Sequence, residues 1–223
     1  MTPADGQVPP AAVLWDLDGT LIDTEPLWIE AEYALVGAHG GTWSNDHARS
    51  IVGSDLLDAA QYIRRVGGVD LEPVLLVEGL IDNGLSGVGD EPVWRPGALE
   101  LLDELATAGV PCALVTMSWR RLADHIVGLL PEDVFQAVVA GDQVANGKPH
   151  PEPYLKAASL LGVDPADCIA IEDSPTGADS ANAAGCTVLA VPNLVDIPQR
   201  QGRVIMSSLS PVDLATLRRM FRR

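Results

Sequence analysis

Short apolar runs recur along the chain, and each is followed by turn residues and then by a pattern of helical period. Because these runs are apolar throughout and do not alternate, they predict strands that are buried on both faces, as in a parallel sheet covered by helices. The pattern predicts six strands, the sixth more weakly than the others: residues 11–16, 112–116, 137–140, 168–173, 187–192 and 203–208.

Between the later runs lie helical patterns whose ends carry proline or glycine. Pro151 begins one of them, Gly162 ends it, and Gly185 ends another, at the positions that proline and glycine favour in helices. Strands that alternate with helices in this way indicate an α/β fold with a parallel sheet. The predicted helices cover residues 97–108, 118–130, 151–162 and 176–185.

The interval between the first two predicted strands interrupts this alternation. It is about 95 residues long, far more than the single helix of a strand–helix–strand crossover needs. Most of the interval has helical periodicity, in three successive stretches at 25–40, 45–68 and 71–87. We therefore predict a small inserted α-helical cap domain at 24–93, and a core domain formed by residues 1–23 and 94–223.

Charge changes the picture more than composition does. With 47% hydrophobic and 20% charged residues the chain is an ordinary globular protein, but its formal net charge is −17. So acidic a surface repels nucleic acid and anionic lipid, and we expect neither as a partner. It also repels small phosphorylated molecules, so a site for them needs local positive charge from a metal, a lysine or helix N-termini.

Three features lead us to expect a cytoplasmic protein. No apolar run approaches the roughly 18–20 residues needed to span a membrane. Residues 1–12 lack the basic start and apolar core of a signal peptide, and we interpret them as a short disordered lead-in. Cys112, Cys168 and Cys186 have neither paired nor zinc-binding spacing, which favours reduced cysteines in the core. The basic ending RRMFRR is interpreted as the frayed end of a helix, in preference to a nucleic-acid-binding tail.

Carboxylates gather where two of the predicted strands end. Asp16 and Asp18 follow the first strand, and Glu172 and Asp173 follow the fourth. Ligands of open parallel sheets bind beyond the carboxyl ends of the strands. Four carboxylates at such an edge would repel one another and take up protons. A hard divalent cation removes the conflict, and Mg²⁺ prefers carboxylates, waters and a substrate phosphate oxygen.

Positive charge and hydroxyl donors follow the other strands. Lys148 comes after the third strand and, together with a metal, would supply the charge that a phosphoryl group needs. Thr116 offers a hydroxyl donor, and Ser118 stands at the predicted N-terminus of the next helix. The sequence therefore predicts a phosphate site beside a metal site.

Taken singly, these residues have ordinary structural interpretations. Asp18 and Gly19 could form a tight turn, Lys148 could be a solvated loop charge, and Glu172 with Asp173 could cap the following helix. Their order, and their common position at strand ends, favours the functional interpretation.

Four runs resemble the motifs of the haloacid dehalogenase-like hydrolase superfamily, in order and across essentially the whole chain: WDLDGTLIDTEPLW (15–28), LVTMS (114–118), GKPHPEPYL (147–155) and IAIEDSPTGADSANAAG (169–185). The chain most resembles the beta-phosphoglucomutase and sugar-phosphate phosphatase group, in which a helical cap is inserted just after the first motif. The resemblance implies a Rossmann-like parallel sheet.

The same resemblance implies roles for the residues. Asp16 would attack phosphorus and form an aspartyl-phosphate, while Asp18 would protonate the leaving oxygen and then activate water. Thr116 and Lys148 would bind the phosphoryl oxygens, beside Ser118, which its place at the helix N-terminus already makes a candidate. The implied Mg²⁺ ligands are Asp16, the backbone carbonyl of Asp18, Asp173, and Glu172 either as a ligand or as a partner of one.

Departures from the family's subgroups narrow the reaction. The lysines are Lys148 and Lys156, so the predicted cap has none for the Schiff base of the phosphonatases. Trp28 stands where the mutases have a histidine, which disfavours mutase activity. Dehalogenases lack the second aspartate of the first motif, whereas Asp18 is present. We therefore expect a phosphatase acting on a small phosphorylated metabolite, a sugar or polyol phosphate being our first choice.

Two alternatives stay open, a beta-phosphoglucomutase-like phosphomutase and a non-catalytic regulator that binds phosphate on the same scaffold. Specificity should come from the predicted cap, where Glu25, Trp28, Arg49 and Gly53 are candidates to face the substrate. Trp28 could instead be a core aromatic, and Arg49 a surface charge. We expect a monomer or a weak homodimer.

Overall fold

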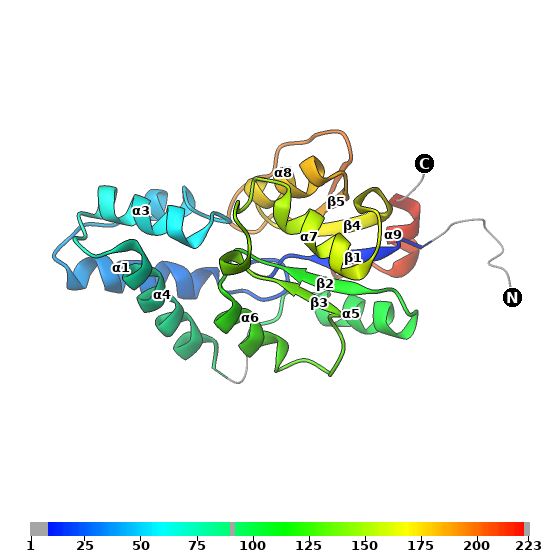
Figure 1. Cartoon of the computed structure of the whole chain (residues 1–223), viewed down its shortest axis with the longest axis horizontal. Helices are drawn as coiled ribbons and strands as arrows, with labels where there is room; N and C mark the ends of the chain where they lie inside the picture. The colour runs from blue at the N-terminus through cyan, green and yellow to red at the C-terminus, as the bar shows by residue number, and fades with distance from the viewer. Residues whose placement is uncertain (1–8, 90–91, 221–223) are drawn as a thin grey trace, which may run out of the picture.

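The computed structural model describes residues 9–89 and 92–220 (Figure 1). Most of the predicted lead-in and the last residues of the basic ending lie outside this part. A six-stranded parallel sheet with the order β3-β2-β1-β4-β5-β6 forms the centre. Its strands are β1 (Ala12–Trp15), β2 (Cys112–Val115), β3 (Ala137–Val139), β4 (Cys168–Glu172), β5 (Thr187–Ala190) and β6 (Arg203–Ile205).

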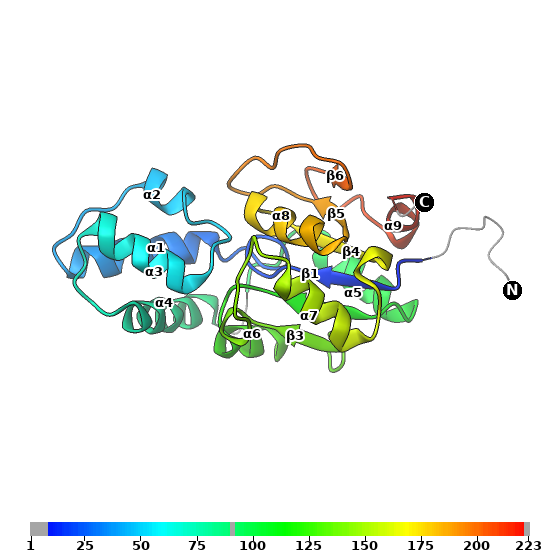
Figure 2. The same cartoon turned by 45° about the horizontal axis from the view of Figure 1, so that its top comes forward.

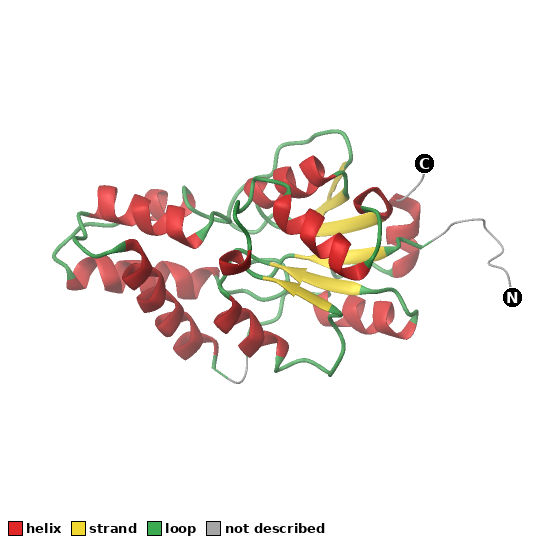
Figure 3. Cartoon of the chain, viewed as in Figure 1, coloured by secondary structure: helices red, strands yellow, loops and turns green. Residues whose placement is uncertain are grey.

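Helices cover both faces of this sheet, as Figure 3 shows. They are α5 (Ala98–Thr107), α6 (Arg120–Val127), α7 (Glu152–Leu161), α8 (Pro175–Ala184) and α9 (Leu214–Met220), with the short 3₁₀ turns η1 (Gly141–Gln143) and η2 (Pro165–Asp167). This is the α/β fold expected from the sequence. Each predicted strand and helix is present, most of them with ends shorter by one to three residues, whereas α8 begins one residue earlier than predicted. The helix α9 was not predicted as a separate element.

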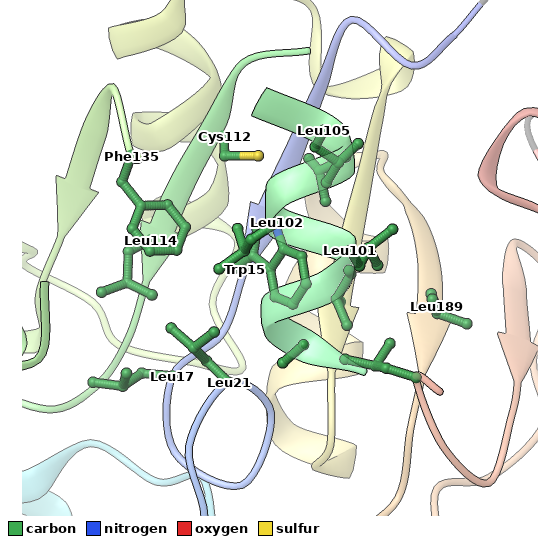
Figure 4. Packing of buried hydrophobic residues seen from close by; sticks show 14 of the residues in the cluster. Trp15, Leu17, Leu21, Leu101, Leu102, Leu105, Cys112, Leu114, Phe135 and Leu189 are labelled. Carbon is green, nitrogen blue, oxygen red and sulfur yellow. The ribbon is translucent and has the colours of Figure 1, made fainter. Parts of the chain in front are cut away.

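The two faces of β1 show why its apolar run has no alternation. Val13 and Trp15 point into a cluster with α5, α6 and α9, whereas Ala12 and Leu14 point into a second cluster with α7 and α8. Figure 4 shows Trp15 packed against the leucines of α5 (Leu101, Leu102 and Leu105). Trp15 is fully buried, and truncating such a side chain to alanine costs about 3–5 kcal/mol.

The long interval between β1 and β2 forms four helices that we call the cap helices: α1 (Glu25–Ala38), α2 (Asn45–Arg49), α3 (Leu56–Gly67) and α4 (Pro73–Val88). They lie beyond the carboxyl ends of the strands (Figures 1 and 2). Three of them, α1, α3 and α4, share a separate hydrophobic cluster, to which α6 adds Leu122. One continuous helical pattern was expected near residues 45–68, but residues 50–55 separate α2 from α3. The domain limits 1–23, 24–93 and 94–223 stay a prediction.

The chain leaves the sheet for the cap helices and returns at neighbouring points. An antiparallel bridge joins Ile22 to Trp94. Asp23 N–H donates to the Val93 carbonyl at 2.8 Å, and Arg95 N–H donates to the Leu21 carbonyl at 3.0 Å. The two connections are therefore held side by side.

Two remaining expectations concern the cysteines and the membrane. All three cysteines are buried and free, as predicted. Burial raises the pKa of each thiol to about 12, so all three stay protonated at neutral pH. Among the described residues, no helix combines the length and the apolarity that crossing a membrane requires.

Candidate active site

The strand order places the predicted acidic residues next to each other. The chain builds one half of the sheet outward from β1 and then returns to start the other half at β4, so β1 and β4 flank the point where the order reverses. Asp16 follows β1, Glu172 ends β4, and Asp173 follows β4. One carboxylate oxygen from each of the three lies within 4.8 Å of the others, and all three residues are buried.

Lys148 is the positive charge at this point. Its Nζ donates to Asp16 Oδ1 at 2.7 Å, to Glu172 Oε1 at 2.6 Å and to the Val115 carbonyl at 2.9 Å, which uses all three of its protons. Burial alone would lower the pKa of Lys148, but the charges of Asp16 and Glu172 outweigh it and hold the pKa above its usual value. The lysine is therefore a fixed cation.

Glu172 holds this lysine in place. Tyr154 donates its hydroxyl to Glu172 Oε1 at 2.5 Å, and Ser174 Oγ lies 3.3 Å from Oε2. With Lys148 included, three side chains donate to one fully buried carboxylate. Glu172 thus serves as an anchor for the lysine as well as a member of the acidic cluster.

The acidic cluster suits a hard divalent cation. Burial, followed by the charge of Glu172, raises the pKa of Asp16 to about 7, and the opposing effect of Lys148 is smaller. Burial and the charge of Asp16 raise the pKa of Asp173 well above its usual range. Asp173 Oδ2 is buried, and no described residue donates to it. Three carboxylates against one lysine, with an oxygen left free, form the donor set that such a cation binds.

Asp18 stands outside this oxygen cluster and is held by four donors. Its Oδ1 accepts from Thr24 Oγ1 at 2.7 Å and from Trp28 Nε1 at 2.8 Å. Its Oδ2 accepts from Ser118 Oγ at 2.7 Å and from Thr116 Oγ1 at 3.2 Å. The two hydroxyls expected to bind phosphate are therefore bonded to Asp18, which links the end of β2 to α1.

Gly19 is required by the turn that places these aspartates. Its φ of +79° belongs to the left-handed region that glycine favours. A Cβ there would lie 2.2 Å from Asp173 Oδ2. Any larger residue would be strained and would push the Asp173 carboxylate out of the cluster.

A pocket opens between this strand edge and the cap helices. Its volume is about 90 Å³, and Asp16, Lys148 and Asp173 line one side. The other side carries Ile29, Val52, Leu56 and Leu80, together with Glu32. Among the described lining residues Lys148 is the only basic one.

Comparison with known proteins agrees with this geometry. The family model described as haloacid dehalogenase-like hydrolase matches residues 13–191. This chain belongs to that family. Hexitol phosphatase A of Escherichia coli (strain K12) is 33% identical over 201 residues, covering 83% of this chain and 85% of the relative. The phosphorylated carbohydrates phosphatase of Thermotoga maritima is 33% identical over 183 residues, covering 78% and 81%.

A solved relative shows how far the likeness extends in space. CbbY from Rhodobacter sphaeroides, in complex with phosphate, superposes with a TM-score of 0.83 at 25% identity, covering 94% of this chain and 99% of that one. Beta-phosphoglucomutase from Clostridium difficile, with a TM-score of 0.82 at 23% identity, shares the fold. Together with the named phosphatases, these findings make the haloacid dehalogenase-like chain a phosphoric monoester hydrolase.

The cap residues singled out in the sequence differ in position. Glu25 and Trp28 line the pocket, and so does Gly53, whose backbone lies against Ser174 so closely that a Cβ would meet Ser174 Oγ at 2.5 Å. Arg49 does not line it. The Arg49 side chain is 55% exposed and lies 3.6 Å from Asp46, on the surface of α2.

Glu25 adds another buried acid close to the cluster. Asn193 donates to its Oε2, while Oε1 is buried without a partner among the described residues. Burial and then the charge of Asp23 raise the pKa of Glu25 to about 7, against the smaller effect of Arg95. Glu25 thus adds negative charge to the side of the pocket that adjoins the sheet.

Three site residues were missed in the sequence: Thr24, Glu32 and Tyr154. Thr24 and Tyr154 lie inside motif runs already quoted, but nothing in the sequence shows which side chain a hydroxyl will meet. The position of Glu32 does follow from the sequence, because a residue four positions after Trp28 lies on the same helix face and so faces the same pocket.

Proposed function

We propose that this phosphatase hydrolyses a sugar or polyol phosphate with Mg²⁺, through an aspartyl-phosphate on Asp16. The observation that carries the proposal is the convergence of Asp16, Lys148 and Asp173 beside the pocket, with a Lys148–Asp16 distance of 2.7 Å. A protein with a formal net charge of −17 repels anions, so an anionic substrate can bind only where positive charge is concentrated. Lys148 and a cation bound by the acidic cluster provide that charge.

Mg²⁺ is the cation that we propose for the cluster, held by Asp16, Asp173 and the backbone carbonyl of Asp18. When bound, it would neutralise the charge that builds up on the phosphoryl oxygens. The donor set contains only oxygens, and Asp173 Oδ2 has no described hydrogen-bond donor. Both features support a hard cation over a transition metal.

The chain's own groups divide the reaction between them. Asp16 Oδ attacks phosphorus, and the bond from phosphorus to the substrate oxygen breaks as Asp18 gives that oxygen a proton. Asp18 then takes a proton from water, which attacks the aspartyl-phosphate and releases inorganic phosphate and free Asp16. Lys148 is held beside Asp16 throughout and faces the developing negative charge.

Asp18 must exchange hydrogen-bond partners during this cycle. Thr116 and Ser118 now donate to its carboxylate. A phosphoryl group that accepts from these two hydroxyls would release Asp18 on that side, while Thr24 and Trp28 keep their hold on Oδ1. Phosphate binding and the freeing of the acid–base group are thereby one event.

The lining of the pocket disfavours the phosphomutase alternative. A mutase must hold a sugar bisphosphate, and its second phosphate needs a cation at the far end of the pocket. Lys148 is the only basic residue among the described lining residues, and it is committed to the strand edge. The intact set of Asp16, Asp18 and Lys148 likewise disfavours a non-catalytic regulator.

Turnover of p-nitrophenyl phosphate tests the proposal. Phosphatase activity should require Mg²⁺, disappear with a chelator and return when Mg²⁺ is restored. A fluoride complex of beryllium should bind Asp16 in a crystal. Turnover that survives Asp16→Asn would refute the nucleophile. A screen of phosphorylated metabolites, read by phosphate release, would then identify the natural substrate class.

We further propose that the enzyme acts in the cytoplasm as a monomer or a weak homodimer, with a small phosphorylated metabolite as its partner. The formal charge of −17 supports the exclusion of nucleic acid and anionic membrane surfaces. Light scattering at several protein concentrations would measure the oligomeric state.

A further inference from the structure

Glu32 is a buried acid on the cap side of the pocket, away from the acidic cluster at the strand edge. It lies on α1 and is 7% exposed. The neighbouring lining residues include Ile29, Leu56 and Leu80, so its surroundings are largely apolar. A carboxyl group in such a place is costly unless something binds it.

Only part of this carboxyl group is satisfied by the protein. Trp43 Nε1 donates to Oε2 at 2.9 Å. Among the described residues no hydrogen bond reaches Oε1, and no lysine, arginine or histidine forms an ion pair with Glu32. Burial raises the pKa of Glu32 to about 7, and the bond from Trp43 lowers it by less. A neutral side chain, such as an amide, could accept the hydrogen bond from Trp43 without the free-energy cost of burying a charge.

Helix geometry relates Glu32 to Trp28, the residue of α1 that contacts Asp18. Trp28, which donates to Asp18 at 2.8 Å, precedes Glu32 by four residues on the same face of α1. Four residues of helix rise by about 6 Å. Since C–C bonds are about 1.5 Å long, a rise of this size along α1 corresponds to a short carbon chain, so a leaving alcohol of that length can extend from Asp18 toward Glu32.

We propose that Glu32 is a specificity-determining residue that accepts a hydrogen bond from a hydroxyl group at the far end of the leaving alcohol. The inference rests on the proposed phosphatase function and goes beyond it by naming what the cap helices recognise. The apolar residues beside Glu32 enclose the carbon chain. The same carboxylate repels a far end that is itself anionic, such as a second phosphate or a carboxylate.

A pair of esters that differ in one hydroxyl isolates this contact. The substrates are pentyl phosphate and 5-hydroxypentyl phosphate, compared by kcat/KM for phosphate release or, if turnover is slow, by inhibition of p-nitrophenyl phosphate hydrolysis. In the native enzyme the hydroxylated ester should be preferred. At pH 8, where the Glu32 carboxyl is mostly ionised, this preference should fall in Glu32→Leu by roughly tenfold or more, the worth of a hydrogen bond to a charged acceptor.

The control is Glu30→Leu, an exposed residue on the same helix that does not line the pocket. It should leave the preference unchanged. Because the preference is a ratio measured within each variant, loss of folded protein cancels. Glu32→Gln, which can still accept from Trp43, should improve use of pentane-1,5-diyl bisphosphate by removing the repulsion.

The outcomes separate this inference from the proposed function. If the native enzyme does not hydrolyse p-nitrophenyl phosphate with Mg²⁺, the proposed function is wrong. If it does, but the preference for the hydroxylated ester in Glu32→Leu stays within twofold of the native value, Glu32 does not bind the hydroxyl of the leaving alcohol. Only this inference is then overturned.

Discussion

The strand edge and the cap helices line one pocket with opposite chemistry. At the strand edge Glu172 receives three donors and Asp18 receives four, so the buried charge of these two residues is matched by hydrogen bonds, while Asp173 Oδ2 is left for a cation. On the cap side Glu32 has one described donor and stands among apolar side chains. A charge held by many partners can be aimed at a reacting atom, whereas a charge with a free oxygen is open to a ligand.

This difference assigns separate tasks to the two sides. Substitutions at the strand edge should reduce kcat for every substrate, because they disturb the groups that move electrons and protons. Substitutions of cap-helix residues that do not contact Asp18 should change which substrate is preferred and leave the turnover of a simple aryl phosphate almost intact. The following substitutions test that assignment.

Asp16→Asn should have the largest effect. Without the nucleophile, kcat for p-nitrophenyl phosphate should fall by about 10⁴-fold or more. Binding of inorganic phosphate, followed by calorimetry in Mg²⁺, should persist because Lys148 is retained. Wild-type-like turnover in this variant would remove Asp16 from the mechanism.

Asp18→Asn should reduce kcat by about 10²- to 10⁴-fold, since proton transfer to the leaving oxygen is lost. The amide has one acceptor oxygen where the carboxylate has two, but Thr116, Ser118 and Lys148 are unchanged, so phosphate affinity should change little. A leaving group that needs no proton, such as p-nitrophenolate, should suffer less than an alkyl ester. Equal losses for both esters would argue against a role in proton transfer.

Trp28→Phe compares the two sides directly. It removes the indole donor to Asp18 and should lower kcat by about tenfold, the value of a hydrogen bond to a charged group. Trp43→Phe is the matched control, because it removes an indole donor to the cap carboxylate Glu32. The control should keep at least a third of native kcat for p-nitrophenyl phosphate. Equal losses in the two variants would contradict the division of tasks.

Glu32→Gln should stabilise the fold in a pH-dependent way. Burial raises the folded-state pKa of Glu32 from 4.5 to about 7. Between these values the unfolded chain releases a proton that the folded chain keeps. The stability linked to Glu32 is therefore fully present below pH 4.5 and is lost as the pH rises through 7. Glutamine does not ionise, so the variant keeps this stability, which is on the order of 1–3 kcal/mol.

Thermal unfolding at two pH values measures this effect. The gain in Tm from Glu32→Gln should be a few degrees at pH 8 and markedly smaller at pH 5. Other raised carboxyls, such as Glu25, are common to both proteins and cancel in the difference. A gain that is equal at the two pH values would show that Glu32 does not titrate in this range.

Arg49→Ala should have the smallest effect. The side chain is 55% exposed, lies 3.6 Å from Asp46 and does not line the pocket. We expect KM for any neutral-ended substrate to change by less than twofold, because exposed ion pairs contribute little. A larger rise in KM would place Arg49 in contact with the substrate.

The sequence was a good guide wherever backbone order decides position. Unbroken apolar runs such as that of β1 predicted buried parallel strands, and the strand ends then placed Asp16 and Asp173 together. The separation of α2 from α3 does not follow from the pattern, because Ile51 and Val52 continue the helical periodicity while Gly53 turns the chain with a φ of +72°.

Side-chain partners were harder to foresee. The motif order indicates that Thr116 and Ser118 approach a phosphoryl group, but it does not indicate that both donate to Asp18 in its absence. The pairing of Glu32 with Trp43 joins α1 to the segment before α2, and such contacts depend on how helices pack. Local pattern carries little information about them.

The bridge between Ile22 and Trp94 has an evolutionary consequence. The inserted stretch begins and ends at adjacent points of the sheet domain, like a long loop. Replacing a loop by a longer or shorter one changes the free energy of folding little. Insertions at this point can therefore be replaced during evolution while Asp16 and Asp18 are kept. A chimaera that takes its insertion from a hexitol phosphatase, joined at these two positions, should inherit the donor's substrate preference.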